Sequence, residues 1–187
     1  MDHVIYDALS LDQFLRLPEA KPALEYIDGK VTQKMAAKRA HSALQNDLAA
    51  EIRAFARPRH LGRGYTELRC TFDGRSLVPD LVFFARGRIP KDEDGRQVDD
   101  VFLPPDLMVE ILSPGQTVKN LSIRLNWCVR HGVRLGWLIQ PRRRRAYIFR
   151  ADRSILTLEL GQDLDGEDVL PGFRLPLATL FGWLDED

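Results

Sequence analysis

The pattern of apolar and polar residues predicts one long amphipathic helix in the first third of the chain. In "HSALQNDLAAEIRAF", residues 41–55, the apolar residues Leu44, Leu48, Ile52 and Phe55 follow one another at spacings of four, four and three. This spacing places the four side chains on one face of an α-helix. We therefore expect a helix that covers a hydrophobic core with this face.

One short helix and one hairpin are predicted before the long helix. The segment "LSLDQFLRLP" has a capping residue, Ser10, and a terminating residue, Pro18, which favour a short helix between them. In "ALEYIDGKVTQKM", Asp28 and Gly29 separate two short extended runs. An Asp-Gly pair in this position is typical of a β-hairpin turn.

Strands are predicted to dominate after the long helix. The segments "YTELRCTF" (65–72) and "LVPDLVFFA" (77–85) each predict one strand, and the turn "DGRS" joins them. Residues 86–104 are polar and rich in Gly, Pro and Asp, so they predict a long loop. Loops of this length are often functional, and we expect this one near the functional site. The apolar run at 107–112 predicts the next strand.

The C-terminal third predicts a second amphipathic helix and more strands. The helix is "VKNLSIRLNWCVRHG", with Gly132 suited to its C-terminal cap, and the strands are "VRLGWLIQP", "RAYIFR" and "SILTLEL". A short helix in "FRLPLATLFGWL" is expected to close the chain. This order of elements predicts an α/β fold with a mixed sheet flanked by helices. The length and the lack of a linker predict a single domain, residues 1–187.

Composition predicts a soluble cytoplasmic protein. The chain has 44% hydrophobic and 29% charged residues, no apolar run long enough to cross a bilayer, and no secretory signal at its start. Cys70 and Cys128 lie far apart and suit structural thiols in a reducing compartment. The 27 basic residues balance the 27 acidic residues, which argues against a non-specific nucleic-acid coat protein but permits a local basic surface.

Two acids stand alone within apolar runs, Asp80 in "LVPDLVFF" and Glu110 in "LMVEIL". Neighbouring strands would bring the two carboxylates together, where they repel unless one is protonated or both bind a cation. Mg²⁺ is held in proteins by one or two carboxylates with water and phosphate oxygens, and it assists phosphodiester hydrolysis. The alternative is that each acid lies at a strand end or pairs with an arginine, because structural ion pairs also place acids near cores. Both interpretations remain open at this point.

A series of motifs resembles a known family. In order, over roughly residues 10–182, the chain contains "ALEYIDGKVTQKM", "HSALQ", "VPDLVFF", "PPDLMVEILSP", "GVRLGWLIQP" and "DVLPGFRLPLATLF". In these motifs it resembles the Uma family of "putative restriction endonucleases", within the PD-(D/E)XK nuclease superfamily. The resemblance implies a restriction-endonuclease-like core and cleavage of DNA that depends on Mg²⁺ or Mn²⁺.

The resemblance also implies roles for individual residues. It places Asp80 and Glu110 at the metal-binding acids of the superfamily. Glu25 in "LEYIDG" corresponds to a further acid near the metal, and its alternative role is a salt bridge within the hairpin. His41 in "HSALQ" matches a typical family position, where a structural or capping role is the more common one for a histidine at a helix start.

One residue departs from the family pattern. The superfamily usually completes its site with a lysine, and the corresponding residue on the predicted helix is Arg124. Arginine binds a phosphate oxygen and neutralises charge, but it does not act as a general base because it stays protonated. Arg124 would therefore stabilise the scissile phosphate, or the site would be slow or inactive. Lys119 lies on the same helix but out of register, and is a weak substitute.

The sequence leaves two alternative functions open, and also two alternative roles for one run of arginines. The first function is a metal-dependent DNA endonuclease, and because nucleases that cut both strands often act as dimers, a homodimer or larger homo-oligomer is expected. The second is a catalytically inert nucleic-acid-binding or oligomeric regulatory protein that kept the fold. Arg142–Arg145 form a run of four arginines that is either a solvated turn or a set of phosphate contacts.

Overall fold

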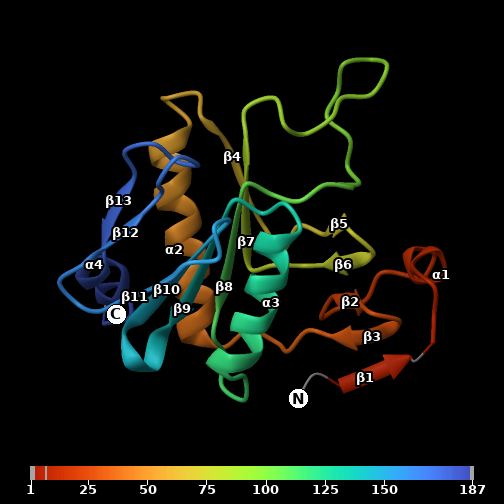
Figure 1. The fold of residues 1–187 in the computed structure, drawn as a ribbon, viewed down its shortest axis with the longest axis horizontal. Coiled ribbons are helices and arrows are strands. Elements are labelled where there is room, and N and C mark those ends of the chain that lie inside the picture. The colour runs from red at the N-terminus through yellow and green to blue at the C-terminus, as the bar shows by residue number, and fades with distance from the viewer. Residues whose placement is uncertain (1–2, 7, 186–187) are drawn as a thin grey trace.

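Three β-sheets and four α-helices make up the fold of residues 3–6 and 8–185, the part that this computed structural model describes (Figure 1). In chain order the elements are β1 (His3–Tyr6), α1 (Leu11–Leu15), β2 (Leu24–Ile27), β3 (Lys30–Gln33), α2 (Arg39–Ala56), β4 (Gly62–Thr66), β5 (Cys70–Phe72), β6 (Arg75–Leu77), β7 (Leu81–Ala85), β8 (Leu107–Ile111), α3 (Val118–Arg130), β9 (Leu135–Gln140), the 3₁₀ turn η1 (Pro141–Arg143), β10 (Arg145–Arg150), β11 (Ile155–Leu158), β12 (Asp163–Asp165), β13 (Arg174–Pro176) and α4 (Leu177–Gly182).

The largest sheet is mixed and has six strands in the order β11-β10-β9-β8-β7-β4. Its strands β8 and β9 are parallel because α3 connects them, whereas β7 and β8 are antiparallel neighbours. The predicted mixed sheet flanked by helices is thereby confirmed. A second sheet of five strands, in the order β1-β3-β2-β6-β5, lies beside it on the right in Figure 1.

Alternating side chains of the central strands supply a hydrophobic core on each face of the six-stranded sheet. Val109 of β8 belongs to the core that contains Leu48 of α2, whereas its neighbour Met108 belongs to the core that contains Leu125 of α3. This is the period of two expected when both faces of a strand are buried. The helices α2 and α3 therefore cover opposite faces, and both begin at the same end of the sheet (Figure 1).

The capping and turn residues behave as predicted. Ser10 and Gln13 form a reciprocal capping box at the start of α1, with N···O distances of 2.8 and 3.2 Å. Asp28 and Gly29, with φ of 51° and 84°, form the turn between β2 and β3. Gly132, with φ of 105°, follows the end of α3. The predicted helices and hairpin are confirmed.

Two segments predicted as single strands are each divided between two sheets. Segment 65–72 contains the end of β4 and all of β5, and segment 77–85 contains the end of β6 and all of β7. Glu67 has φ of 54°, which interrupts the extended backbone of the first segment. In the second, Pro79 has no N–H to donate to a ladder. Asp80 consequently lies immediately before β7, not inside a strand.

Three short strands were not predicted. They are β1, β12 and β13, which have three or four residues each. The strand "DLD" contains a single central apolar residue, which is too little pattern to indicate a strand. The strand "RLP" takes up the start of "FRLPLATLFGWL", where a helix was predicted, so the helix α4 begins only at Leu177.

Residues 86–104 form a long loop as predicted, with only isolated β-bridges at Lys91, Gln97 and Val101. The expectation that this loop lies near the acids is wrong. It connects the end of β7 to the start of β8, whereas Asp80 precedes β7 and Glu110 is near the end of β8. Because the two strands are antiparallel, the loop is at the opposite end of the sheet, at the top of Figure 1. Within the described ranges, no helix has the length and apolar character required to cross a membrane.

Candidate active site

Asp80 and Glu110 lie next to each other at the end of the six-stranded sheet where α2 and α3 begin. Leu81 of β7 is opposite Val109 of β8, so the residue before Leu81 is beside the residue after Val109. The two acids are 2% and 4% exposed, and both line a cavity of about 950 Å³. The prediction that the two carboxylates lie together is confirmed, although Asp80 precedes its strand; their role as metal ligands remains a prediction.

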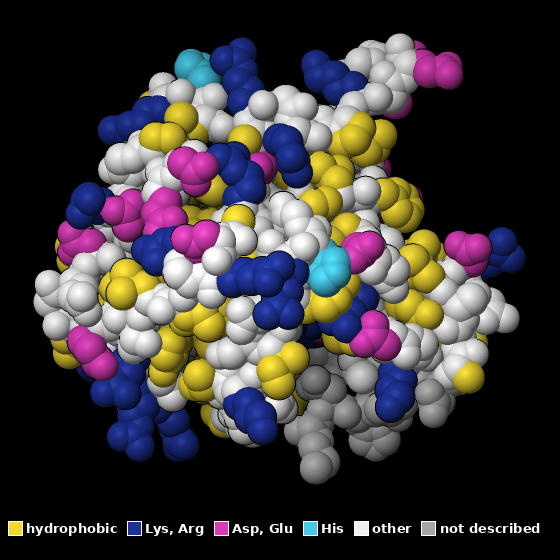
Figure 2. Space-filling model, in the orientation of Figure 1, with side chains coloured by type: hydrophobic (Ala, Val, Ile, Leu, Met, Phe, Trp, Pro, Cys, Tyr) yellow, Lys and Arg dark blue, Asp and Glu magenta, His cyan; other side chains and the backbone are white. Residues whose placement is uncertain are grey.

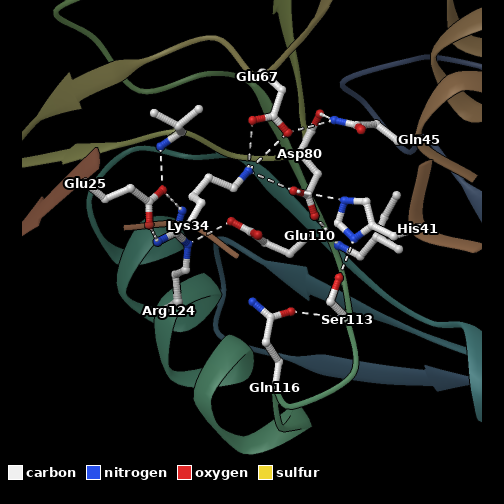
Figure 3. A network of polar contacts seen from close by, with 12 residues as sticks. Glu25, Lys34, His41, Gln45, Glu67, Asp80, Glu110, Ser113, Gln116 and Arg124 are labelled. Atoms are coloured by element: carbon white, nitrogen blue, oxygen red, sulfur yellow. Dashed lines mark hydrogen bonds and ion pairs between the residues drawn. The ribbon is translucent and has the colours of Figure 1, made fainter. Parts of the chain in front are cut away.

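Both oxygens of Asp80 have close partners (Figure 3). Oδ2 accepts a hydrogen bond of 2.7 Å from the backbone N–H of Ile111, which ties Asp80 to the end of β8. Oδ1 lies 2.9 Å from Nζ of Lys34 and 3.3 Å from Nε2 of His41. Burial would raise the pKa of Asp80, but the contacts with His41 and Lys34 lower it to about 2. Asp80 is therefore an ionised carboxylate.

His41 belongs to the site and is not a helix cap. It lies in the first turn of α2, whose N-cap is Lys38. Its Nδ1 is 2.8 Å from Oγ of Ser113, so the ring is held between Ser113 and Asp80. Burial would lower the pKa of His41, but the hydrogen bond and charge of Asp80 raise it.

Arg124 joins Glu110 and Glu25 from the other side of the cavity. Its Nε donates to Oε1 of Glu110 at 2.7 Å, and its two terminal nitrogens donate to the two oxygens of Glu25 at 2.6 and 2.8 Å. Glu25 also accepts from the backbone N–H of Val78 at 2.6 Å. Burial would raise the pKa of Glu25, but Arg124 and Val78 hold it below its ordinary value. The salt bridge of Glu25 thus connects its hairpin to α3 instead of lying within the hairpin.

Glu110 is the carboxyl group of the site whose pKa is raised. Burial raises its pKa to about 7, and the charges of Asp80 and Glu25 act in the same direction, against the opposing charges of Arg124 and Lys34. Burial and the charges of Asp80 and Glu25 therefore favour a bound proton or an additional cation at Glu110.

Three further polar residues of the site escaped the sequence analysis: Lys34, Gln45 and Glu67. Nζ of Lys34 lies 3.2 Å from each carboxylate oxygen of Glu67, and Nε2 of Gln45 donates to Glu67 and to the backbone carbonyl of Asp80. The hairpin offered a signal for Lys34. Thr32 is opposite Glu25, and residues two apart on a strand share a face, so Lys34 lies on the face of Glu25. Glu67 had no such signal, because the backbone bend at this residue places it.

The remaining candidate residues lie elsewhere. Lys119 does not line the cavity. In the run of four arginines, Arg144 pairs with Asp185 at 2.6 Å and Arg145 pairs with Glu159 at 2.8 Å. Arg142 and Arg143 are exposed on η1.

The metal-binding potential of the site rests on two carboxylates. Among residues 3–6 and 8–185, no group of three or more His, Cys, Asp and Glu side chains is arranged to hold a metal ion. Two buried carboxylates nevertheless suit Mg²⁺, which keeps several waters and takes further oxygens from a phosphate substrate. The raised pKa of Glu110 agrees with this fit, because a cation would stabilise its ionised form.

Comparisons with known proteins give the family and the fold of the chain. The family model described as "Putative restriction endonuclease" (Uma2) matches residues 11–178. A crystal structure described as "a putative nuclease belonging to DUF820", from Anabaena variabilis ATCC 29413, is similar over 94% of this chain and 99% of that chain, with 35% identity and a TM-score of 0.90. None of the curated proteins matches the sequence. The extent of the family match shows that this chain belongs to the Uma2 family of restriction-endonuclease-like proteins.

Proposed function

We propose that this protein is an endonuclease that hydrolyses DNA phosphodiester bonds with Mg²⁺ or Mn²⁺ held by Asp80 and Glu110. The observation that carries the proposal is a pair of buried carboxylates that line a cavity of about 950 Å³ and contact Lys34, His41 and Arg124. Buried acids with opposed pKa shifts in one cleft are a frequent sign of a functional site. Membership of a nuclease family supports the same reaction class.

The residues of the cavity would have different roles in the reaction. Asp80 and Glu110 would hold the metal, which when bound supplies polarisation of the phosphate and a lowered pKa of bound water. Glu25 assists by fixing Arg124, and Arg124 in turn orients Glu110 through the 2.7 Å contact. The backbone N–H of Ile111 and the ring of His41 fix Asp80. The site is thus preorganised before DNA binds, which is the main source of electrostatic catalysis.

Cleavage of supercoiled plasmid tests the proposal. We expect wild-type protein with Mg²⁺ or Mn²⁺ to convert supercoiled plasmid to nicked or linear DNA, and we expect EDTA to stop the conversion. Plasmid incubated with each metal but without protein serves as the blank. If wild type matches this blank with every metal tried and still binds DNA, the protein is an inert nucleic-acid-binding member of the family.

That alternative has a specific observation in its favour. Arg124 stands where the superfamily pattern has lysine, and its three contacts tie up Glu25 and Glu110 in internal ion pairs. A protein that had lost the reaction would keep these ion pairs of Arg124 for stability alone. Metal binding and cleavage separate the two functions.

Phosphate contacts are expected at η1, the turn between β9 and β10. Leu138 of β9 is paired with Glu110, and the parallel strands end on the same side, so η1 lies at the site's end of the sheet. Lys and Arg side chains gather over this turn at the lower left of Figure 2. Of the four arginines there, Arg144 and Arg145 are paired with acids, whereas Arg142 and Arg143 are exposed and form no ion pair with a described residue.

We expect the double substitution Arg142→Ala and Arg143→Ala to weaken DNA binding without regard to sequence. Each lost phosphate contact should reduce the slope of log K against log salt by about 1. The matched control is Arg153→Ala, an exposed arginine at the opposite end of β10, which should leave the slope unchanged. Fluorescence anisotropy of a labelled duplex at several salt concentrations, with EDTA present, measures both. An unchanged slope in the double variant would assign the whole arginine run to a solvated turn.

A further inference from the structure

The ammonium group of Lys34 lies among the acids of the cavity, where the sequence pattern predicts no lysine (Figure 3). Its Nζ is 2.9 Å from Oδ1 of Asp80 and 3.2 Å from each oxygen of Glu67, and the side chain is 17% exposed. Lys34 follows β3 directly, and its backbone N–H donates to the carbonyl of Ala23 at 2.9 Å. The hairpin therefore fixes the base of the side chain, while its four-carbon stem reaches into the site.

Arg124, a second cation that lines the cavity, does not occupy this position. All three of its side-chain nitrogens contact Glu25 or Glu110, and none of its described hydrogen bonds goes to Asp80. A guanidinium held by a bidentate contact is a rigid fork, and breaking it would leave two buried carboxylates without their main counter-charge. Arg124 is thus committed to the protein, whereas Lys34 has a flexible stem and three donors that can change partners.

On these contacts, and resting on the proposed nuclease function, we propose that Lys34 supplies the lysine of this active site and contacts the phosphate at the cleaved bond, while Arg124 is a buried positioning residue. The amine reaches Asp80 from the β2–β3 hairpin, although the family pattern places the lysine on the helix that contains Arg124. A metal held by Asp80 and Glu110 would repel the ammonium of Lys34, because both are cations. Lys34 would keep its contact with Glu67 and turn its freed donor to a phosphate oxygen of the substrate.

Chemical restoration of the amine tests the assignment. Lys34→Met keeps most of the length of the side chain and removes its charge, and we expect it to lower the single-turnover cleavage rate by about 10²-fold or more, as for the loss of one donor to a transition-state oxyanion. Lys34→Cys should be equally slow, and alkylation with 2-bromoethylamine, which forms a thioether analogue of lysine, should restore at least about tenfold. The native thiols of Cys70 and Cys128 are buried, and burial raises the pKa of each to about 12, so the new cysteine is the reactive one. The matched control is Lys30→Met in the same hairpin, at an exposed position.

Calorimetry of Mn²⁺ binding distinguishes a role at the phosphate from a role in building the site. We expect Lys34→Met to bind Mn²⁺ at least as tightly as wild type, because a competing cation has been removed from Asp80. Loss of Mn²⁺ binding together with loss of cleavage would show that Lys34 organises the acids, and would overturn the proposal. Cleavage by Lys34→Met at the wild-type rate would overturn it while leaving the nuclease function intact. If wild type itself does not cut, the nuclease function and this assignment fail together.

Discussion

Replacing Asp80 with Asn is expected to lower plasmid cleavage by about 10²-fold to 10³-fold, and Glu110→Gln is expected to have an effect of the same order. Either change removes one of the two charged oxygen groups available to a metal and to the charge that develops on the phosphate. A rate for either variant within tenfold of wild type would remove that residue from the proposed metal site.

The same two variants should differ in stability when metal is removed with EDTA. The pKa of Asp80 is lowered to about 2, so its ionised form stabilises the fold above its unfolded pKa, and this contribution is lost as pH falls towards 2. Asp80→Asn should therefore lower the free energy of unfolding at pH 7 by about 2 kcal/mol. The loss should shrink below pH 4.

The effect of Glu110 on stability changes with pH in the opposite direction. Its pKa is raised to about 7, so the folded state holds a proton that the unfolded state releases, and stability falls as pH rises from the unfolded pKa through 7. Glu110→Gln should therefore be more stable than wild type at pH 8 by about 1–3 kcal/mol, with no difference near pH 4. Urea unfolding at several pH values measures both variants. Equal effects of the two substitutions at pH 8 would contradict the opposed pKa shifts.

The elements with strong local patterns were predictable from sequence. The repeat of Leu44, Leu48 and Ile52 in α2 is dictated by burial of one helix face, and the turn at Asp28–Gly29 depends only on its own two residues. Asp80 and Glu110 were found because a lone acid in an apolar run is costly without a partner.

The parts that depend on tertiary geometry could not be predicted in this way. The strand break at Glu67 follows from a change of sheet, which no local pattern records, whereas Pro79 is a local signal against a single strand in its segment. The position of the loop 86–104 depends on which end of β7 carries Asp80. One partner of Arg124, Glu25, comes from a hairpin 99 residues away in sequence, so the sequence could identify the arginine but not this contact. The local sequence thus identified Asp80 and Glu110. Tertiary packing determines that Lys34 and Arg124 are the cations in contact with them.

Arg124→Met is expected to be the most destabilising substitution in the site. The Arg124 side chain is 13% exposed, and its removal leaves Glu25 and Glu110 buried without their main counter-charge. Removing one partner of a buried ion pair typically costs about 3–5 kcal/mol, and we expect a loss of this size at pH 8. The matched control is Arg145→Met, whose ion pair with Glu159 is exposed and should contribute less than about 1 kcal/mol.

A double-mutant cycle shows whether this loss of stability comes from the ion pair between Arg124 and Glu25. If Arg124 acts mainly by compensating Glu25, then Arg124→Met should cost at least about 1 kcal/mol less in a Glu25→Gln background than in wild type. The loss should also shrink at pH 5, where Glu110 takes up a proton and needs less compensation. Additive effects at pH 8 would mean that Arg124 stabilises the fold through the packing of its stem. In that case the effect of Arg124→Lys on stability would depend on the shape of the side chain and not on its charge.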